Sequence, residues 1–165
     1  MSDNAFENVG APPENKDPKE TLFYLKSVVL AFEKSGHPRI KPMQRKLNQA
    51  IKELATKSKT KTPEEVAKLF NKRTEELRLQ TFSLLQTVIN QVRGTLATQK
   101  KFFSAQDREH RWEELSESLK MFSKGINLFL KAKKSQNKEL EDKALGLIKE
   151  ASDLLGTSLT AESKL

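Results

Sequence analysis

The sequence predicts an all-α fold, an antiparallel bundle of about five helices built on a long helical hairpin at residues 63–134. Apolar residues recur every three or four positions in five segments, which is the spacing of one buried helix face. Helix start and stop signals separate these segments. No stretch alternates apolar and polar residues with a period of two, so we expect no strand.

Composition limits the chain to one ordinary domain. It has 165 residues, 36% hydrophobic and 32% charged, and no cysteine. The missing cysteines exclude a disulfide framework, a thiolate zinc site and a cysteine nucleophile. The longest apolar runs, such as residues 28–32, are far shorter than the roughly 20 residues of a membrane-spanning helix. We therefore expect a soluble, intracellular protein of the cytoplasm.

Three regions follow from the order of these signals. Residues 1–16 are polar and acidic, so they predict a flexible acidic tail without the features of a secretory signal. Residues 17–156 carry all the periodic segments and predict the helical bundle domain. Residues 157–165 are polar and predict a flexible C-terminal tail.

Capping residues predict the ends of the first two helices. Asp17 can cap the first helix, and Pro18 is tolerated in the first turn because its missing N–H would be unbonded there. The helix should run to about Lys34, where Gly36 supplies a left-handed cap. The second helix should begin near Pro42.

The third helix has the best start signal of the chain. Thr62 and Glu65 can each satisfy a free backbone donor of the other, which is the capping box. Apolar spacing then continues to about Lys101, with Gly94 the one weak point. A fourth helix should follow a start signal at 104–107, and a fifth should end at Gly156.

Unequal helix lengths predict an uncovered apolar surface. The third helix would span roughly 55 Å, and short connections place the second and fifth helices at the same end of the hairpin. Either a kink at Gly94 or the first helix covers the far half, or that half is an interface for a second copy or a partner helix. The candidate interface residues are Val88, Val92, Leu96, Phe102, Phe103 and Trp112.

Basic residues gather in two segments. Residues 39–61 contain eight basic side chains against Glu53 alone, and residues 120–138 contain six lysines and no acid. The antiparallel scheme brings the two segments together as one basic pole, a candidate anion-binding site made of Arg39, Lys41, Arg45, Lys46, Lys52, Lys57, Lys59, Lys61, Lys131, Lys133 and Lys134. This pole is either a solvated face, a cover for the acidic N-terminal tail, or a site for phosphates, lipid headgroups or an acidic protein.

The search for reactive chemistry finds no catalytic motif. His110 has Asp107, Glu113 and Glu114 at helical spacing, but a bundle metal site needs a second such motif, so we interpret this group as a charged helix face. No nucleophile elbow or glycine-rich phosphate loop is present. We expect no catalytic residues, no cofactor and no metal.

The chain ends in Ser163-Lys164-Leu165, which matches the tripeptide that the peroxisomal import receptor reads. The alternatives are a peroxisomal matrix protein and an incidental ending of a cytosolic or bacterial protein. As a function we expect a non-enzymatic helical adaptor or scaffold that binds a protein partner or forms a homodimer. The alternative is a basic protein that binds nucleic acid or an anionic membrane surface.

Overall fold

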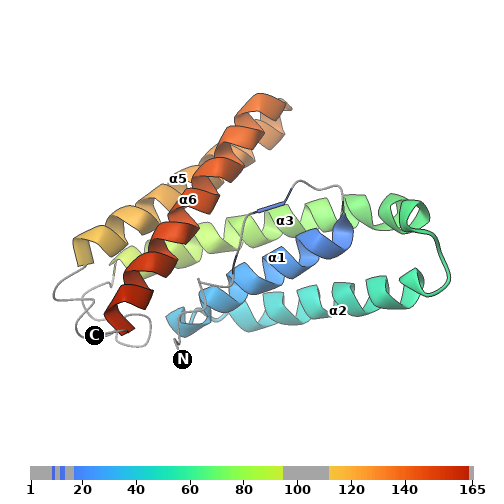
Figure 1. Cartoon of the computed structure of the whole chain (residues 1–165), viewed down its shortest axis with the longest axis horizontal. Coiled ribbons are helices and arrows are strands. Elements are labelled where there is room, and N and C mark those ends of the chain that lie inside the picture. Colours follow the sequence, from blue (N-terminus) through green and yellow to red (C-terminus); the bar gives the residue numbers. More distant parts are fainter. Residues whose placement is uncertain (1–8, 10–11, 14–16, 95–111, 164–165) are drawn as a thin grey trace.

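The computed structural model describes residues 9, 12–13, 17–94 and 112–163, and over these residues it confirms an all-α fold. Five helices pack together, and this part of the chain contains no strand. The elements are α1 (Pro18–Ala31), the 3₁₀ turn η2 (Glu33–Ser35), α2 (Ile40–Ser58), α3 (Pro63–Gly94), α5 (Trp112–Ser135) and α6 (Lys138–Ser163) (Figure 1).

The first helix begins at the expected residues but ends earlier than expected. The Lys19 backbone N–H donates to the Asp17 carboxylate at 3.0 Å, which caps α1. Gly36 adopts the left-handed conformation with φ 72°. The α-helix itself ends at Ala31, before the expected Lys34, because the chain tightens into η2 before it reaches the glycine.

The capping box of α3 is confirmed. The Glu65 N–H donates to the Thr62 hydroxyl, and the Thr62 N–H donates to the Glu65 carboxylate, each at 3.3 Å. The Thr62 hydroxyl also donates to the Glu65 carboxylate, at 3.0 Å. The two bonds that the carboxylate accepts, from the Thr62 N–H and from the Thr62 hydroxyl, lower the pKa of Glu65 because they stabilise its charged form. The expected continuation of this helix beyond Gly94 lies outside the described residues.

The last helix is longer than the sequence indicated. We expected Gly156 to end it, but α6 continues through Gly156 to Ser163. A glycine inside a helix costs only about 1 kcal/mol relative to alanine, so it weakens the helix without terminating it. Residues 157–163 are thus helical, where the sequence predicted a tail.

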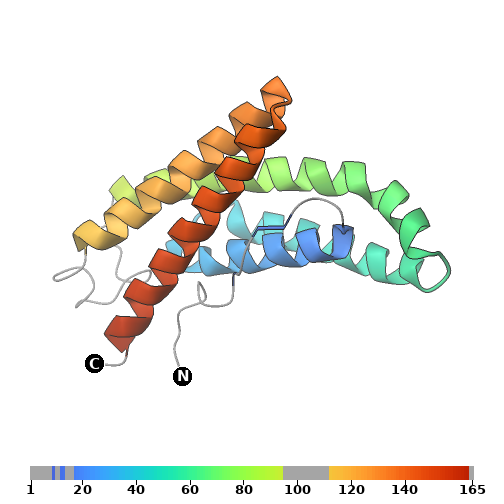
Figure 2. The same ribbon diagram turned by 45° about the horizontal axis from the view of Figure 1, so that its top comes forward.

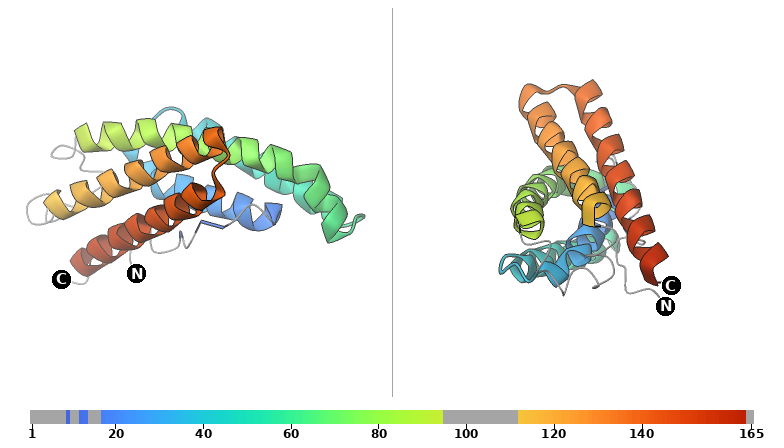
Figure 3. Two further views of the ribbon diagram at one scale, coloured as in Figure 1. Left: turned by 90° about the horizontal axis from the view of Figure 1, so that it is seen from above. Right: turned by 90° about the vertical axis from the view of Figure 1, so that its left-hand side faces the viewer.

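The helices form two groups. α1, α2 and α3 run side by side, while α5 and α6 form a hairpin that lies obliquely across the C-terminal half of α3 (Figures 1 and 2). Seen from above, the turn between α5 and α6 lies over the middle of α3, short of the turn between α2 and α3, and seen from one end it rises away from α1, α2 and α3 (Figure 3). α5 makes its most extensive contacts with α6.

This arrangement covers the far half of the long helix. Leu85, Val88, Ile89 and Val92 are all fully buried, because α1 and α5 both pack against α3. Of the alternatives that the sequence left open, cover by the first helix therefore holds for this part of α3, and the interface alternative does not. The core also includes Val9, so the N-terminal segment that we predicted to be a free tail contributes a buried side chain.

The α5–α6 contact depends on one glycine. A Cβ added at Gly125 would lie 2.7 Å from Ile148 Cγ1 and 3.1 Å from the Ile148 backbone nitrogen. At Gly146, on the exposed side of α6, an added Cβ would meet nothing within 4 Å. The absence of a side chain at Gly125 therefore sets how closely the two helices approach.

We expect Gly125→Ala and Gly146→Ala to change stability in opposite directions. Overpacking at position 125 costs about 1–3 kcal/mol, which exceeds the gain of about 1 kcal/mol from the better helix propensity of alanine. At position 146 an added methyl group meets no neighbour, so only the gain in helix propensity remains and the variant should be more stable. Urea unfolding of both variants checks this, and a Gly125→Ala protein as stable as Gly146→Ala would contradict the close contact.

Candidate functional site

The exposed side of α2 and the residues that flank this helix carry seven positive charges. The apolar face of α2, with Ile40, Met43, Leu47, Ala50 and Leu54, is buried in the bundle, so the other side must face solvent. We call the exposed cations of this segment the basic face: Arg39, Lys41, Arg45, Lys46, Lys52, Lys57 and Lys59. Lys61 is half-buried at the turn that follows.

The single acid of the segment does not neutralise this face. Glu53 forms an ion pair with Arg73 on α3 and accepts a hydrogen bond from the Gln49 amide at 3.2 Å. The Arg73 hydrogen bond is the main reason that the pKa of Glu53 is lowered. Glu53 is therefore charged, but its charge is balanced by an arginine outside the basic face.

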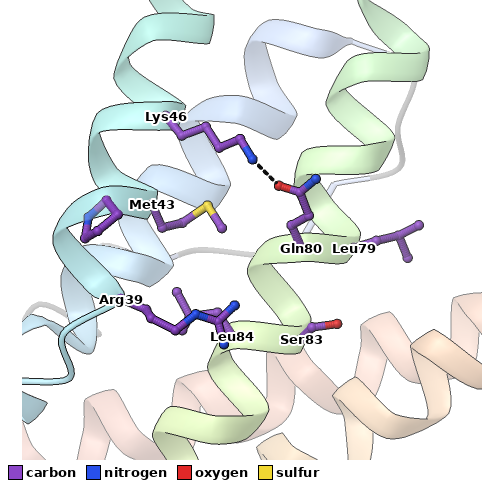
Figure 4. A pocket seen from close by; sticks show the side chains of 8 residues that line it. Arg39, Met43, Lys46, Leu79, Gln80, Ser83 and Leu84 are labelled. Carbon is purple, nitrogen blue, oxygen red and sulfur yellow. Dashed lines mark hydrogen bonds between the residues drawn. The ribbon is translucent and has the colours of Figure 1, made fainter.

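A groove lies between the start of α2 and the middle of α3. It has a volume of about 450 Å³ and is lined by Arg39, Pro42, Met43, Lys46, Leu79, Gln80, Ser83 and Leu84 (Figure 4). Met43 and Leu84 are buried and Leu79 is half-buried, whereas the five other lining residues are exposed. The groove thus has an apolar floor and a polar, positively charged rim.

The rim is closed on one side by a side-chain hydrogen bond. Lys46 Nζ donates to Gln80 Oε1 at 2.7 Å, and Figure 4 shows the two side chains facing each other from α2 and α3. Both residues are exposed, so the bond competes with water and contributes little to stability. On the floor, the Thr81 hydroxyl donates to the Met43 sulfur at 3.6 Å.

The second basic segment lies elsewhere, which corrects the expected single pole. Lys133 Nζ lies 3.0 Å from a Glu75 carboxylate oxygen and 3.1 Å from one of Glu141. Glu75 is twelve positions after Pro63, or about 18 Å along α3 from the turn that carries Lys59 and Lys61. The cause is the oblique crossing of α5, which does not follow α3 to its start. Lys131 and Lys134 are exposed near the same end of α5.

An ion cluster, formed by Glu75, Arg78, Lys133 and Glu141, joins α3 to both helices of the α5–α6 hairpin. Glu75 and Lys133 are half-buried, and we call it the buried ion cluster after its fully buried member, Arg78. Arg78 is 1% exposed. Its guanidinium donates to Glu75 at 2.7 Å, to Glu141 at 3.4 Å and to the Pro13 carbonyl at 3.2 Å. Two cations and two carboxylates balance each other, as buried charges require.

Two aromatic residues, Phe129 and Tyr24, lie near this cluster. The Arg78 guanidinium carbon lies 4.7 Å from the centre of the Phe129 ring, and Lys133 Nζ lies 5.7 Å from it. Burial raises the pKa of the Tyr24 hydroxyl above its ordinary value, while the positive charge of Arg78 acts in the opposite direction. Tyr24 is therefore uncharged, and its hydroxyl has no hydrogen-bond partner among the described residues.

Sequence reasoning missed this cluster although a signal was present. Arg78 lies in the apolar stripe of α3, between Leu77 and Phe82, where a cation has to find buried partners. Glu75 lies three positions before it, but Glu141 and Pro13 lie more than sixty positions away, so the sequence did not identify the cluster. The α3 side of the groove was missed as well, because Gln80 and Ser83 have no distinctive motif.

The remaining candidate residues are either core residues, residues outside the described part of the chain, or members of the C-terminal tripeptide. Val88 and Val92 are core residues and offer no exposed surface for an interface. Leu96, Phe102, Phe103, Asp107 and His110 lie outside the described residues, as do the side chains of Trp112, Glu113 and Glu114. Of the C-terminal tripeptide, Ser163 is the last residue of α6, and Lys164 and Leu165 lie beyond the described range.

Among the residues that the structure describes, no three His, Asp or Glu side chains gather closely enough to hold a metal ion. None of the helices formed by these residues combines the length and apolar character needed to cross a membrane. Comparison with known proteins returned no matching family, no matching curated protein and no matching solved structure.

Proposed function

We propose that this protein is a non-enzymatic helical interaction module that binds an acidic surface of a partner protein through the basic face of α2. The observation that carries the proposal is the charge of that face. It presents seven exposed cations, and the only acid of its segment is paired with Arg73. Such a field attracts negatively charged partners and speeds their association.

Nucleic acid and anionic membranes are the alternative partners, and two features of α2 disfavour them. The helix contains no aromatic residue on which a base could stack. Its large apolar residues are buried in the bundle except Ile51, which is half-buried, so the helix lacks the exposed apolar face that enters a lipid interface. A protein surface needs neither feature, because it is recognised by complementary charge with apolar contacts nearby.

The test compares three labelled probes: a glutamate-rich helical peptide, a DNA duplex and phosphatidylserine vesicles. We expect the peptide to bind most tightly at low salt. Binding should weaken at about 0.5 M salt, where the Debye length falls to roughly 4 Å. Arg45→Glu combined with Lys52→Glu should reduce peptide affinity at least tenfold, because both substitutions reverse charges on the basic face.

The matched control reverses two exposed lysines on α3, Lys68→Glu and Lys72→Glu, which changes the net charge of the protein equally. If the control lowers affinity as much as the α2 variant, total charge rather than the basic face drives binding, and the proposal fails. Tighter binding of DNA or of vesicles than of the peptide would favour the alternative function instead.

A further inference from the structure

The groove beside the basic face differs from the rest of that face because it combines charge with partly accessible apolar surface, of which half-buried Leu79 is the most accessible residue. Arg39 and Lys46 supply two cations at its rim, and Leu79, Met43 and Leu84 supply apolar contacts. A charged face that interacts only with water does not require apolar residues beside its cations. The floor lies directly beside the cations of α2, so one ligand segment can contact both.

We propose that this groove seats an apolar side chain of an acidic segment of the partner protein, with carboxylates on either side of it. The proposal rests on the proposed function and specifies which part of α2 makes the decisive contact. Carboxylates complement Arg39 and Lys46, and the apolar side chain replaces water over half-buried Leu79.

The size and openness of the groove fit this occupant. About 450 Å³ is in the lower half of the range of ligand pockets, enough for one or two apolar side chains. Its lining spans only residues 39–46 of α2 and 79–84 of α3, which is too short for a whole partner helix. Met43 adds an adaptable surface, because its unbranched side chain and polarisable sulfur can adjust to different apolar groups.

Lys46 provides the polar part of the recognition. In the free protein it donates to the neutral Gln80 amide, and both partners are exposed. A carboxylate forms a stronger hydrogen bond with an ammonium group than an amide oxygen does. The ligand therefore displaces Gln80 from Lys46, and this exchange opens the rim of the groove at little cost.

The experiment uses two labelled glutamate-rich peptides of equal charge, one with a central Leu-Phe pair and one with serines in its place. We expect the Leu-Phe peptide to bind at least tenfold more tightly to the wild-type protein. Ser83→Trp, which fills the groove from an exposed position, should remove this preference and leave the weak, salt-sensitive binding of both peptides. Thr87→Trp, exposed one turn further along α3, is the matched control and should behave as the wild type.

The outcomes separate this inference from the proposed function. Equal affinity of the two peptides for the wild type, or an unchanged preference in Ser83→Trp, would overturn the groove proposal alone, since binding through the basic face would persist. Loss of the preference in Thr87→Trp as well would also overturn it. If neither peptide binds the wild type, the groove proposal and the proposed function are both refuted. Circular dichroism of each variant confirms that the helices are retained.

Discussion

Arg78→Met should destabilise the protein by about 3 kcal/mol, although the substitution replaces a charged side chain by an apolar one of similar length. Arg78 is 1% exposed and contacts two carboxylates and a carbonyl oxygen. Removing one partner from a buried ion pair costs about 3–5 kcal/mol, because the remaining charge loses its compensation. We expect the low end of this range, since Lys133 still contacts both Glu75 and Glu141.

Urea unfolding measures this loss, and Arg73→Met is its control. The Arg73–Glu53 pair joins two side chains that are 40% and 43% exposed, so its removal should cost much less than the removal of Arg78. The double variant Arg78→Met, Glu141→Gln should recover part of the stability, because it leaves one cation, Lys133, paired with one carboxylate, Glu75. Equal effects of Arg78→Met and Arg73→Met would show that the buried ion cluster does not join α3 to the hairpin.

Phe129→Ala should produce the largest loss of stability, about 3–5 kcal/mol. The ring is fully buried and meets Phe82 edge to face, with the ring centres 4.9 Å apart. It also lies beneath the Arg78 guanidinium, so its removal leaves a cavity beside buried charges. Phe129→Leu should cost less, because it keeps most of the buried volume while losing the ring contacts.

The control for this prediction is Phe23→Ala on α1. Phe23 is 44% exposed, so its truncation should change the free energy of unfolding by much less than the truncation of Phe129. Thermal or urea unfolding of the three variants gives the order Phe129→Ala, Phe129→Leu, Phe23→Ala in decreasing loss. A Phe129→Ala protein no less stable than Phe23→Ala would place Phe129 outside the core.

The groove and the buried ion cluster show which parts of the candidate site could be predicted from the sequence. The positive charge of α2 could be read from composition, since eight basic residues stand against Glu53. No feature of the sequence indicated that α3 would place Leu79 and Ser83 at the same groove as Arg39. Nor did it reveal that Lys133 is paired with carboxylates, because its partners lie on other helices.

Local sequence determined where most helices begin and which face each one buries. The caps at Asp17 and Thr62 act within a few residues, and the 3–4 spacing of apolar residues specifies a buried stripe whatever the stripe packs against. Only the tertiary structure decided how the helices cross, and with it the cover over Val88, the separation of the two basic segments and the groove beside Lys46. Crossing angles follow from the fit of side-chain ridges between helices distant in sequence, here shaped by the close approach at Gly125 and the ion cluster at Arg78.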